Sequence, residues 1–372
     1  PPQGPHPPAR LMTGAPDSVV VGISGGVDSS VAAWCLLEKG HEVTGLFMKN
    51  WEEDDDESYC AAAVDLDYAE KACQLLDIPL RTVNFAHEYW EKVFTIFLGE
   101  YRAGRTPNPD VLCNREIKFR EFLHHADRLG GARIATGHYA RIGSNPTSLT
   151  LLKGHDPAKD QSYFLHTLGQ YELGRTLFPL GEMTKTQVRR QAQVLGLPNA
   201  ARKDSTGICF IGERRFKDFL ARYLPACPGQ IKTLDGQVVG EHDGLWYFTL
   251  GQRHGLDIGG PGEAWYVAAK EMENNVLRVV QGHEHPALMC TTAEAVDLHW
   301  IAEVSPDAPL RCSAKTRYRQ TDQPCTVSRI DSDRIVVEFD DPQRAVTPGQ
   351  SLVLYQDQIL VGGGAISHTA NG

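Results

Sequence analysis

The chain has 372 residues, of which 41% are hydrophobic and 23% are charged, and its formal net charge at pH 7 is −10. This composition excludes disordered and fibrous proteins, and the length predicts two or three domains with cores of their own. No run approaches the roughly 20 uninterrupted apolar residues of a membrane span, and the N-terminus lacks the basic-then-apolar order of a secretory signal. We therefore expect a cytoplasmic protein with no membrane partner and a flexible tail over residues 1–17.

The nine cysteines are scattered, odd in number and without a Cys-x-x-Cys pair. This spacing argues against a disulfide framework and a zinc ribbon, and we predict no metal-ligating cluster. The negative net charge weighs against a nucleic-acid partner. However, acidic residues are concentrated at 52–57, whereas Arg311, Lys315, Arg317 and Arg319 cluster near the other end. This asymmetry permits an RNA-binding surface on one side of the molecule.

Residues 18–212 alternate short apolar strands with helices. Strands are predicted at 19–23, 42–48, 81–85 and 133–136, and helices at 31–39, 65–76, 87–102 and 113–129. This alternation is typical of βαβ units, which form a parallel sheet with helices on both faces. The predicted fold class is α/β, with a Rossmann-like nucleotide-binding domain over residues 18–212.

The pattern changes after residue 212. One more helix is predicted at 213–224, and the glycine-rich and proline-rich stretch to residue 275 predicts a small β-rich central domain or connector. Strand signals then dominate, at 276–280, 326–330, 334–339 and 351–355. Short strands with turns at close intervals predict a C-terminal β-barrel over residues 276–372.

The segment Ser24-Gly25-Gly26-Val27-Asp28-Ser29-Ser30 directly follows the first predicted strand. Backbone N–H groups in such a glycine turn, together with the start of the next helix, bind phosphate. The segment lacks the lysine of the Walker signature, so we do not expect cleavage between the β and γ phosphates of ATP. Because ligands of open α/β sheets lie beyond the carboxyl ends of the strands, Met48 and the Gly137-His138 turn should face the same crevice. Met48 lines an adenine pocket or belongs to the core.

Two further segments carry cysteines in unusual settings. Residues 106–114 contain two prolines and lead to Cys113 at the start of a predicted helix, where the helix dipole stabilises a thiolate. Asp110 lies one turn earlier and either transfers a proton or caps the helix. Residues 204–212 place Cys209 between bulky apolar residues. The pair suggests a two-thiol mechanism, in which one sulfur is transferred and the other resolves the intermediate. Packing thiols and ligands of an iron–sulfur cluster are the alternatives.

Several of these segments resemble known families. The SGGxDS loop is similar to that of the PP-loop pyrophosphatases, which cleave ATP between the α and β phosphates and activate a substrate oxygen as an adenylate. Eight other segments resemble the tRNA-specific 2-thiouridylase family. They are residues 45–51, 104–110, 135–139, 159–165, 204–212, 249–253, 281–283 and 315–319. The resemblance covers nearly the whole chain from about residue 18.

The resemblance implies sulfur transfer to C2 of the wobble uridine in the anticodon loop of tRNA, with ATP and Mg²⁺. It implies a sulfur donor such as a sulfur-carrier protein or a cysteine desulfurase. Cys209 corresponds to the persulfide carrier, Cys113 to its catalytic partner and Asp110 to the acid/base residue. The implied ATP contacts are Gly22, Ile23, Ser24, Gly25, Gly26, Val27, Asp28, Ser29, Met48 and Gly137. The implied tRNA contacts are Asn108, Pro109, Asp110, His138, Lys159, Asp160, Gln161, Arg317, Tyr318 and Gln350.

Three other functions compete with this interpretation. Another PP-loop adenylating ligase or amidotransferase would have the same loop but no need of Cys113 and Cys209. A non-catalytic RNA-binding or sulfur-carrier protein would not need an intact phosphate loop. A cluster-dependent tRNA thiolase would use the two cysteines as iron ligands, and thiolate chemistry alone leaves this alternative open.

Overall fold

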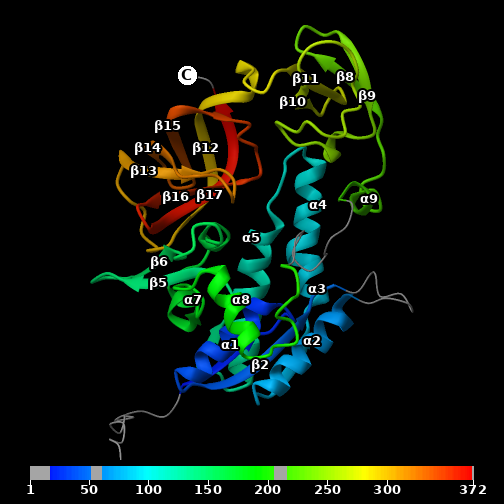
Figure 1. The fold of residues 1–372 in the computed structure, drawn as a ribbon. Coiled ribbons are helices and arrows are strands. Elements are labelled where there is room, and N and C mark those ends of the chain that lie inside the picture. The colour runs from blue at the N-terminus through cyan, green and yellow to red at the C-terminus, as the bar shows by residue number, and fades with distance from the viewer. Residues whose placement is uncertain (1–16, 52–60, 205–215, 371–372) are drawn as a thin grey trace, which may run out of the picture.

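The computed structural model describes residues 17–51, 61–204 and 216–370. Figure 1 shows three units in chain order: an α/β unit, a small β-rich unit at the far end of two long helices, and a β-barrel beside them. The predicted fold class is confirmed, including the parallel sheet and the terminal barrel. Within the described part of the chain, no helix combines the length and apolar character needed to cross a lipid bilayer.

The N-terminal unit is built on a five-stranded parallel sheet with the order β3-β2-β1-β4-β7. Its strands are β1 (Ser18–Gly22), β2 (Glu42–Lys49), β3 (Leu80–Asn84), β4 (Arg133–Ala135) and β7 (Thr176–Leu177). Val19 and Val21 on β1 are fully buried, because helices cover both faces of the sheet and leave its central strand no solvent side. The four predicted strands agree with the observed ones to within one residue, whereas β7 was not predicted.

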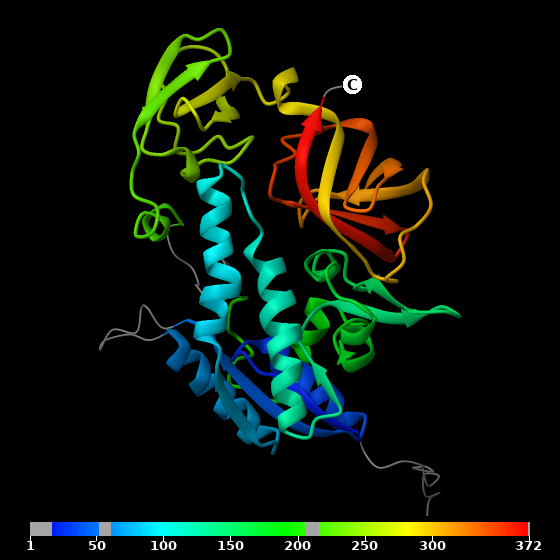
Figure 2. The ribbon, with the colours of Figure 1, turned by 180° about the vertical axis from the view of Figure 1, so that it is seen from behind.

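Helices connect these strands and extend beyond them. They are α1 (Val27–Glu38), α2 (Ala61–Leu75), α3 (Ala86–Tyr89), η1 (Trp90–Phe94), α4 (Thr95–Arg102), α5 (Pro109–Cys113), η2 (Asn114–Glu121), α6 (Phe122–Arg128), η3 (Ser162–Leu165), α7 (Gln170–Arg175), α8 (Lys185–Val194) and α9 (Phe216–Leu220). Residues 86–102 and 109–128 each form one long helix that passes through a π-helical stretch. Figure 2 shows these two helices side by side.

Two helix starts differ from the prediction. The first helix begins at Val27, not at residue 31, so the glycine turn leads straight into it. The helix predicted from residue 113 begins at Pro109, because proline has the backbone angle of a first helical residue and lacks the N–H that would go unpaired there. Cys113 is therefore the fifth residue of this helix rather than its first, and the prediction of a thiol at the helix start is wrong by one turn.

The central unit contains a four-stranded sheet with the order β10-β11-β8-β9. Its strands are β8 (Gly229–Thr233), β9 (Val238–His242), β10 (Trp265–Glu271) and β11 (Val276–Gln281). The sequence prediction placed residues 276–280 in the terminal barrel, but β11 pairs with β10 and β8. We therefore propose that the central domain extends to Gln281. The predicted helix at 213–224 corresponds to the shorter α9, and residues 213–215 lie outside the described residues.

The C-terminal unit is a closed barrel of six strands. They are β12 (Met289–Trp300), β13 (Leu310–Lys315), β14 (Gln323–Ile330), β15 (Arg334–Arg344), β16 (Ser351–Gln356) and β17 (Ile359–Ala370), and β12 pairs with β17 to close it. A hairpin of β5 (Ala140–Ser144) and β6 (Leu149–Lys153) from the N-terminal unit adds to β17 through β6. The barrel is thus held to the α/β unit by strand pairing as well as by side chains.

Candidate active site

The phosphate loop lies between β1 and α1 at the carboxyl edge of the parallel sheet. Gly25 has φ +75°, and a Cβ atom there would lie 2.3 Å from the carbonyl oxygen of Asp65, so only glycine fits. Ser29 and Ser30 donate their hydroxyls to the carbonyl of Gly26, at 3.0 and 3.2 Å. Gly26 is the N-cap of α1 and supplies no side-chain acceptor. The first N–H groups of α1 are therefore suited to bind an anion.

Two residues far along the chain brace the outer side of this loop. Asn199 Nδ2 donates to the carbonyls of Gly25 and Gly26, each at 3.1 Å, and lies 2.9 Å from Ser30 Oγ. Arg202 donates to the carbonyl of Gly25 at 3.2 Å and forms an ion pair with Asp65. With their carbonyls bound from behind, the glycines keep the conformation that turns their N–H groups toward a phosphate.

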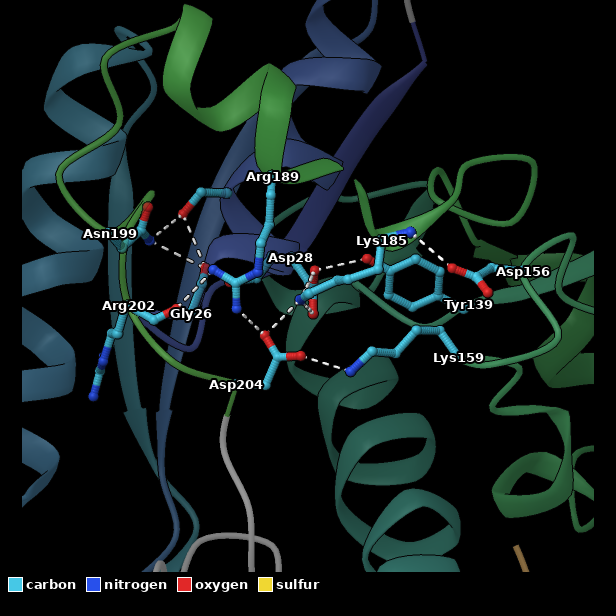
Figure 3. Close-up of polar contacts among 12 residues, drawn as sticks. Gly26, Asp28, Tyr139, Asp156, Lys159, Lys185, Arg189, Asn199, Arg202 and Asp204 are labelled. Carbon is cyan, nitrogen blue, oxygen red and sulfur yellow. Dashed lines mark hydrogen bonds and ion pairs between the residues drawn. The ribbon is translucent and has the colours of Figure 1, made fainter. Parts of the chain in front are cut away.

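Two side chains donate hydrogen bonds to Asp28, the acidic residue of the loop. Tyr139 donates its hydroxyl to Oδ1 at 2.8 Å, and the ammonium of Lys185 donates to Oδ1 and Oδ2 at 2.7 and 2.8 Å. Lys185 also lies 2.7 Å from Oδ1 of Asp204 (Figure 3). Because its side chain is only 11% exposed, this lysine links the two carboxylates with little competition from water.

Asp204 is surrounded by cations. Lys159 donates to Oδ2 at 2.6 Å, and Lys185 and Arg189 pair with Oδ1. Burial by itself raises the pKa of Asp204, but the hydrogen bonds and charges of Lys159 and Lys185 outweigh it and lower the pKa to about 2. Asp204 is therefore ionised at neutral pH. It is also the last described residue before the segment that carries Cys209.

The other predicted ATP contacts gather around the same loop. A Cβ atom on Gly137 would lie 3.0 Å from the backbone nitrogen of Ser29, so the turn after β4 approaches the start of α1 closely. A Cβ atom on Gly22 would lie 3.3 Å from Cε of Met48. Met48 is half-buried and packs against two apolar clusters. The structure thus brings these residues together, and their contact with ATP stays a prediction.

Cys113 and Asp110 share one face of the helix that begins at Pro109, because they are three residues apart. Cys113 is fully buried in an aromatic cluster that includes Trp51, Tyr89 and Phe94, whereas Asp110 is half-buried. Met48 packs against this cluster as well, so the cluster adjoins the phosphate loop. Cys209 lies outside the described residues, and the structure gives no distance between the two sulfurs.

The predicted tRNA contacts at 159–161 are engaged with the protein. Lys159 pairs with Asp204. Asp160 is 5% exposed and accepts from the backbone nitrogens of Gly154 and Ser162, at 3.0 and 3.1 Å. Gln161 accepts from the backbone nitrogen of Tyr139 at 3.0 Å, and Tyr139 in turn binds Asp28. This segment therefore shapes the surroundings of the phosphate loop.

His138 is also buried. Its Nδ1 lies 2.8 Å from the hydroxyl of Thr136, and its ring packs against those of Phe119 and Phe178. Burial, with a smaller contribution from the charge of Lys118, holds the pKa of His138 well below its usual range. The imidazole is therefore neutral at physiological pH, and it supplies no positive charge for RNA.

The barrel holds the loop that leads into the Asp110 helix. Gln350 donates to the carbonyls of Thr106 and Pro107, at 2.8 and 3.2 Å, and the backbone nitrogen of Thr106 donates to the carbonyl of Pro348 at 2.9 Å. Gly349 has φ +91°, and a Cβ atom there would lie 2.9 Å from the nitrogen of Thr106. The position of Asn108, Pro109 and Asp110 thus depends on residues 348–350.

Arg317 and Tyr318, the predicted RNA contacts of the barrel, lie near the same junction. Arg317 is exposed and donates to the carbonyl of Ala345 at 2.6 Å. The hydroxyl of Thr347 donates to that carbonyl too, at 2.9 Å, and the backbone nitrogen of Gln350 donates to the carbonyl of Thr347 at 3.1 Å. The ring of Tyr318 lies 4.3 Å from that of Phe164. One continuous set of contacts therefore runs from Arg317 to the loop that leads to Asp110.

Comparison with known proteins identifies the family. The tRNA-specific 2-thiouridylase MnmA of Methylococcus capsulatus is 60% identical over 359 residues, which cover 95% of this chain and 97% of that protein. MnmA of Salmonella paratyphi B is 58% identical over 360 residues, covering 95% and 98%. The chain belongs to the tRNA-specific 2-thiouridylase family. The family predicted from the sequence motifs is thereby confirmed.

Family models match three consecutive parts of the chain. They are described as a tRNA methyl transferase HUP domain over residues 17–213, a tRNA methyl transferase PRC-barrel domain over 217–281 and an aminomethyltransferase beta-barrel domain over 291–366. The methyltransferase wording differs from the 2-thiouridylase relatives, and the full-length identity to those relatives decides the family. Among solved structures, a 4-thiouridine synthetase–RNA complex with bound ATP overlays on 52% of this chain and 44% of that one, at 16% identity and a TM-score of 0.33. A likeness this weak carries no functional information.

Proposed function

We propose that this chain, as a member of the 2-thiouridylase family, replaces the C2 oxygen of a wobble uridine in tRNA by sulfur, at the expense of ATP. The observation that carries the proposal is the 60% identity over 95% of the chain to a tRNA-specific 2-thiouridylase. The geometry supports it, because Met48, which a Cβ atom on Gly22 would approach to 3.3 Å, packs against the cluster that buries Cys113. A ligase or amidotransferase of the same fold has no use for that cysteine.

The first step activates the base. The uridine C2 oxygen attacks the α-phosphate of ATP, the bond to the β-phosphate breaks, and pyrophosphate leaves with the electron pair. The N–H groups of residues 25–29 hold the phosphates, and Lys185, which is hydrogen-bonded to Asp28, lies beside this loop. A fixed cation and fixed N–H dipoles stabilise the charge that develops on the phosphate, because they need no reorganisation during the reaction.

Mg²⁺ is part of the proposal as a partner of the triphosphate. Among residues 17–51, 61–204 and 216–370, no group of three or more His, Cys, Asp or Glu side chains is arranged to hold a metal ion. This fits Mg²⁺, which is usually held by one or two carboxylates, water and substrate phosphates rather than by a protein cage. Asp28 is the carboxylate of the loop suited to that role, and the ion would neutralise triphosphate charge.

The second step delivers sulfur. The terminal sulfur of a persulfide on Cys209 attacks C2 of the activated uridine, and AMP leaves with the C2 oxygen. The Cys113 thiolate then attacks the Cys209 sulfur, which releases 2-thiouridine and leaves a disulfide between the two cysteines. An external thiol reduces this disulfide, and a sulfur-carrier protein or cysteine desulfurase restores the persulfide. Asp110, on the same helix face as Cys113, accepts the proton that the Cys113 thiol loses and passes it to the released 2-thiouridine.

Mass spectrometry of the wobble nucleoside tests the proposal. The protein is incubated with ATP, Mg²⁺, a persulfide donor and unmodified tRNA, and we expect 2-thiouridine together with AMP and pyrophosphate. In Cys209→Ser, thiolation should disappear while tRNA-dependent pyrophosphate release continues; Cys73→Ser, on a helix of the nucleotide-binding unit, is the control that should retain both. Absence of any mass gain with the wild-type protein would overturn the proposal.

A separate measurement distinguishes the cluster-dependent alternative. Anaerobically purified protein is assayed for iron and acid-labile sulfide and then for thiolation after treatment with an iron chelator. We expect substoichiometric iron and unchanged thiolation. A stoichiometric cluster whose removal abolishes thiolation would replace the persulfide mechanism by the iron–sulfur one.

A further inference from the structure

Two cysteines of the barrel, outside the site described above, face each other across neighbouring strands. Cys312 on β13 is directly opposite Cys325 on β14, and their sulfur atoms lie 3.7 Å apart. Directly opposed residues of an antiparallel pair have Cα atoms roughly 4.5 to 5.5 Å apart, which is within the span of a disulfide. A bond between these sulfurs therefore needs rotation of side chains but no change of strand register.

The two thiols differ in access and acidity. Cys325 is fully buried in the barrel core, whereas Cys312 is half-buried. The hydrogen bond between the sulfurs lowers the pKa of Cys312 and raises the pKa of Cys325. The charge of Arg311 also favours the Cys312 thiolate. Cys312 is therefore the sulfur that an external reagent reaches, and Cys325 is the sulfur placed to resolve the product.

We propose that Cys312 and Cys325 form a reversible dithiol/disulfide site that is oxidised by small-molecule disulfides of the glutathione class. The Cys312 thiolate attacks one sulfur of the small disulfide, so that a mixed disulfide forms and one small thiolate leaves. Cys325 then gives its proton to the released small thiolate and attacks the Cys312 sulfur, which expels the second small thiolate. The two protein thiols lose two electrons and two protons, and the small disulfide becomes two thiols.

The two cysteines lie at the base of a hairpin loop. β13 and β14 flank residues 316–322, and this loop carries Arg317 and Tyr318. A covalent bond at its base limits the conformations that the loop samples. The chemistry of the pair does not depend on the proposed thiolation, because it involves neither the phosphate loop nor Cys113.

The peptide map of the native chain tests this site directly. Trypsin cleaves after Arg311, Lys315, Arg319 and Arg329, which separates Cys312 and Cys325 into the peptides 312–315 and 320–329. The full-length protein is equilibrated with reduced and oxidised glutathione, alkylated and digested without reductant. We expect the disulfide-linked peptide pair to increase about tenfold or more between the reducing and the oxidising buffer, and to vanish after dithiothreitol.

Variants separate the pair from other cysteines. Cys312→Ser and Cys325→Ser should each abolish the linked peptides, whereas Cys290→Ala should leave them unchanged, because Cys290 is in the same barrel but opposite Gln343. The map of the wild-type protein is decisive even if a variant fails to fold. If both peptides are recovered unlinked from oxidising buffer, whether alkylated or carrying glutathione, the proposed site does not exist.

Discussion

The ammonium of Lys185 donates to both carboxylate oxygens of Asp28, at 2.7 and 2.8 Å, across 157 positions of sequence. In Lys185→Met, Asp28 and Asp204 lose the cation that they share. We expect kcat/KM for ATP to fall roughly 30-fold, which corresponds to about 2 kcal/mol for a lost charge-assisted hydrogen bond. The measurement is tRNA-dependent pyrophosphate release.

The matched control for this variant is Lys71→Met. Lys71 also pairs with an aspartate at 2.7 Å, but its side chain is 57% exposed, and such surface pairs contribute little. We expect its rate to stay within about twofold of wild type. Equal rates for Lys185→Met and the wild-type protein would contradict the role assigned to Lys185.

Asp204 should make the free energy of unfolding depend on pH. Its pKa is about 2 in the folded protein, below the ordinary value of 3.8. A carboxyl whose pKa is lowered by folding stabilises the protein above its unfolded pKa and loses this contribution as pH falls from about 4 to about 2. At neutral pH, Asp204→Asn should therefore be less stable by about 1 kcal/mol, after allowance for solvent screening. Urea midpoints of both proteins at neutral pH and near pH 3 check this. A difference that stays constant or widens in acid would disagree with the assignment.

We expect a side chain at position 137 to weaken ATP binding because of a close contact, and not because of the backbone conformation there. In Gly137→Ala the new Cβ would lie 3.0 Å from the nitrogen of Ser29 and would displace the first turn of α1. We expect KM for ATP to rise about tenfold, because an N–H dipole at the anion site moves out of line. Gly259→Ala is the control, since nothing lies within 4 Å of a Cβ there. The idea fails if the two variants bind ATP equally well.

Gly349 of the barrel lies against the loop that leads to Asp110. Gly349 and Gly236 both have left-handed backbone angles, φ +91° and +96°, but only at Gly349 would a Cβ press on the nitrogen of Thr106. Both alanine variants should lose about 1 kcal/mol of stability from the unfavourable backbone angle. Only Gly349→Ala should lower kcat for thiolation, by about tenfold or more, because it shifts the loop before Asp110. Parallel losses of kcat in both variants would show that stability alone is responsible.

Much of the nucleotide-binding unit could be predicted from local sequence patterns. The apolar run at 19–23 and the glycines at 25 and 26 predict a strand followed by a phosphate-binding turn. The strand and the turn are observed, and phosphate binding stays a prediction. The residues that brace it were missed. Asn199 and Arg202 lie 137 to 177 positions from the residues that they bind, and no periodicity or motif near them indicates such a contact. Lys185 follows a helix N-cap at Thr184, which predicts a helix start but no function.

Strand pairing was the other limit of prediction. The pattern at 276–280 correctly indicates a strand, but alternation along one strand does not show which sheet it joins, and β11 belongs to the central unit. The hairpin of β5 and β6 was also beyond prediction from local patterns, because it pairs with β17 of another unit. Cys312 and Cys325 carry no recognisable spacing, and only the antiparallel register places their sulfurs together.

The sequence by itself therefore determined the family and the order of the three units. It also determined the residue types of the phosphate loop and of the segments that carry Cys113 and Cys209, because these depend on local patterns and contiguous motifs. The tertiary structure decided which distant charges meet at Asp28 and Asp204, and that the loop before Asp110 is held by residues 348–350 of the barrel. The physical reason is that these ion pairs, close contacts and strand pairings join residues from 13 to 244 positions apart. No local pattern contains both partners, and packing decides which ones meet.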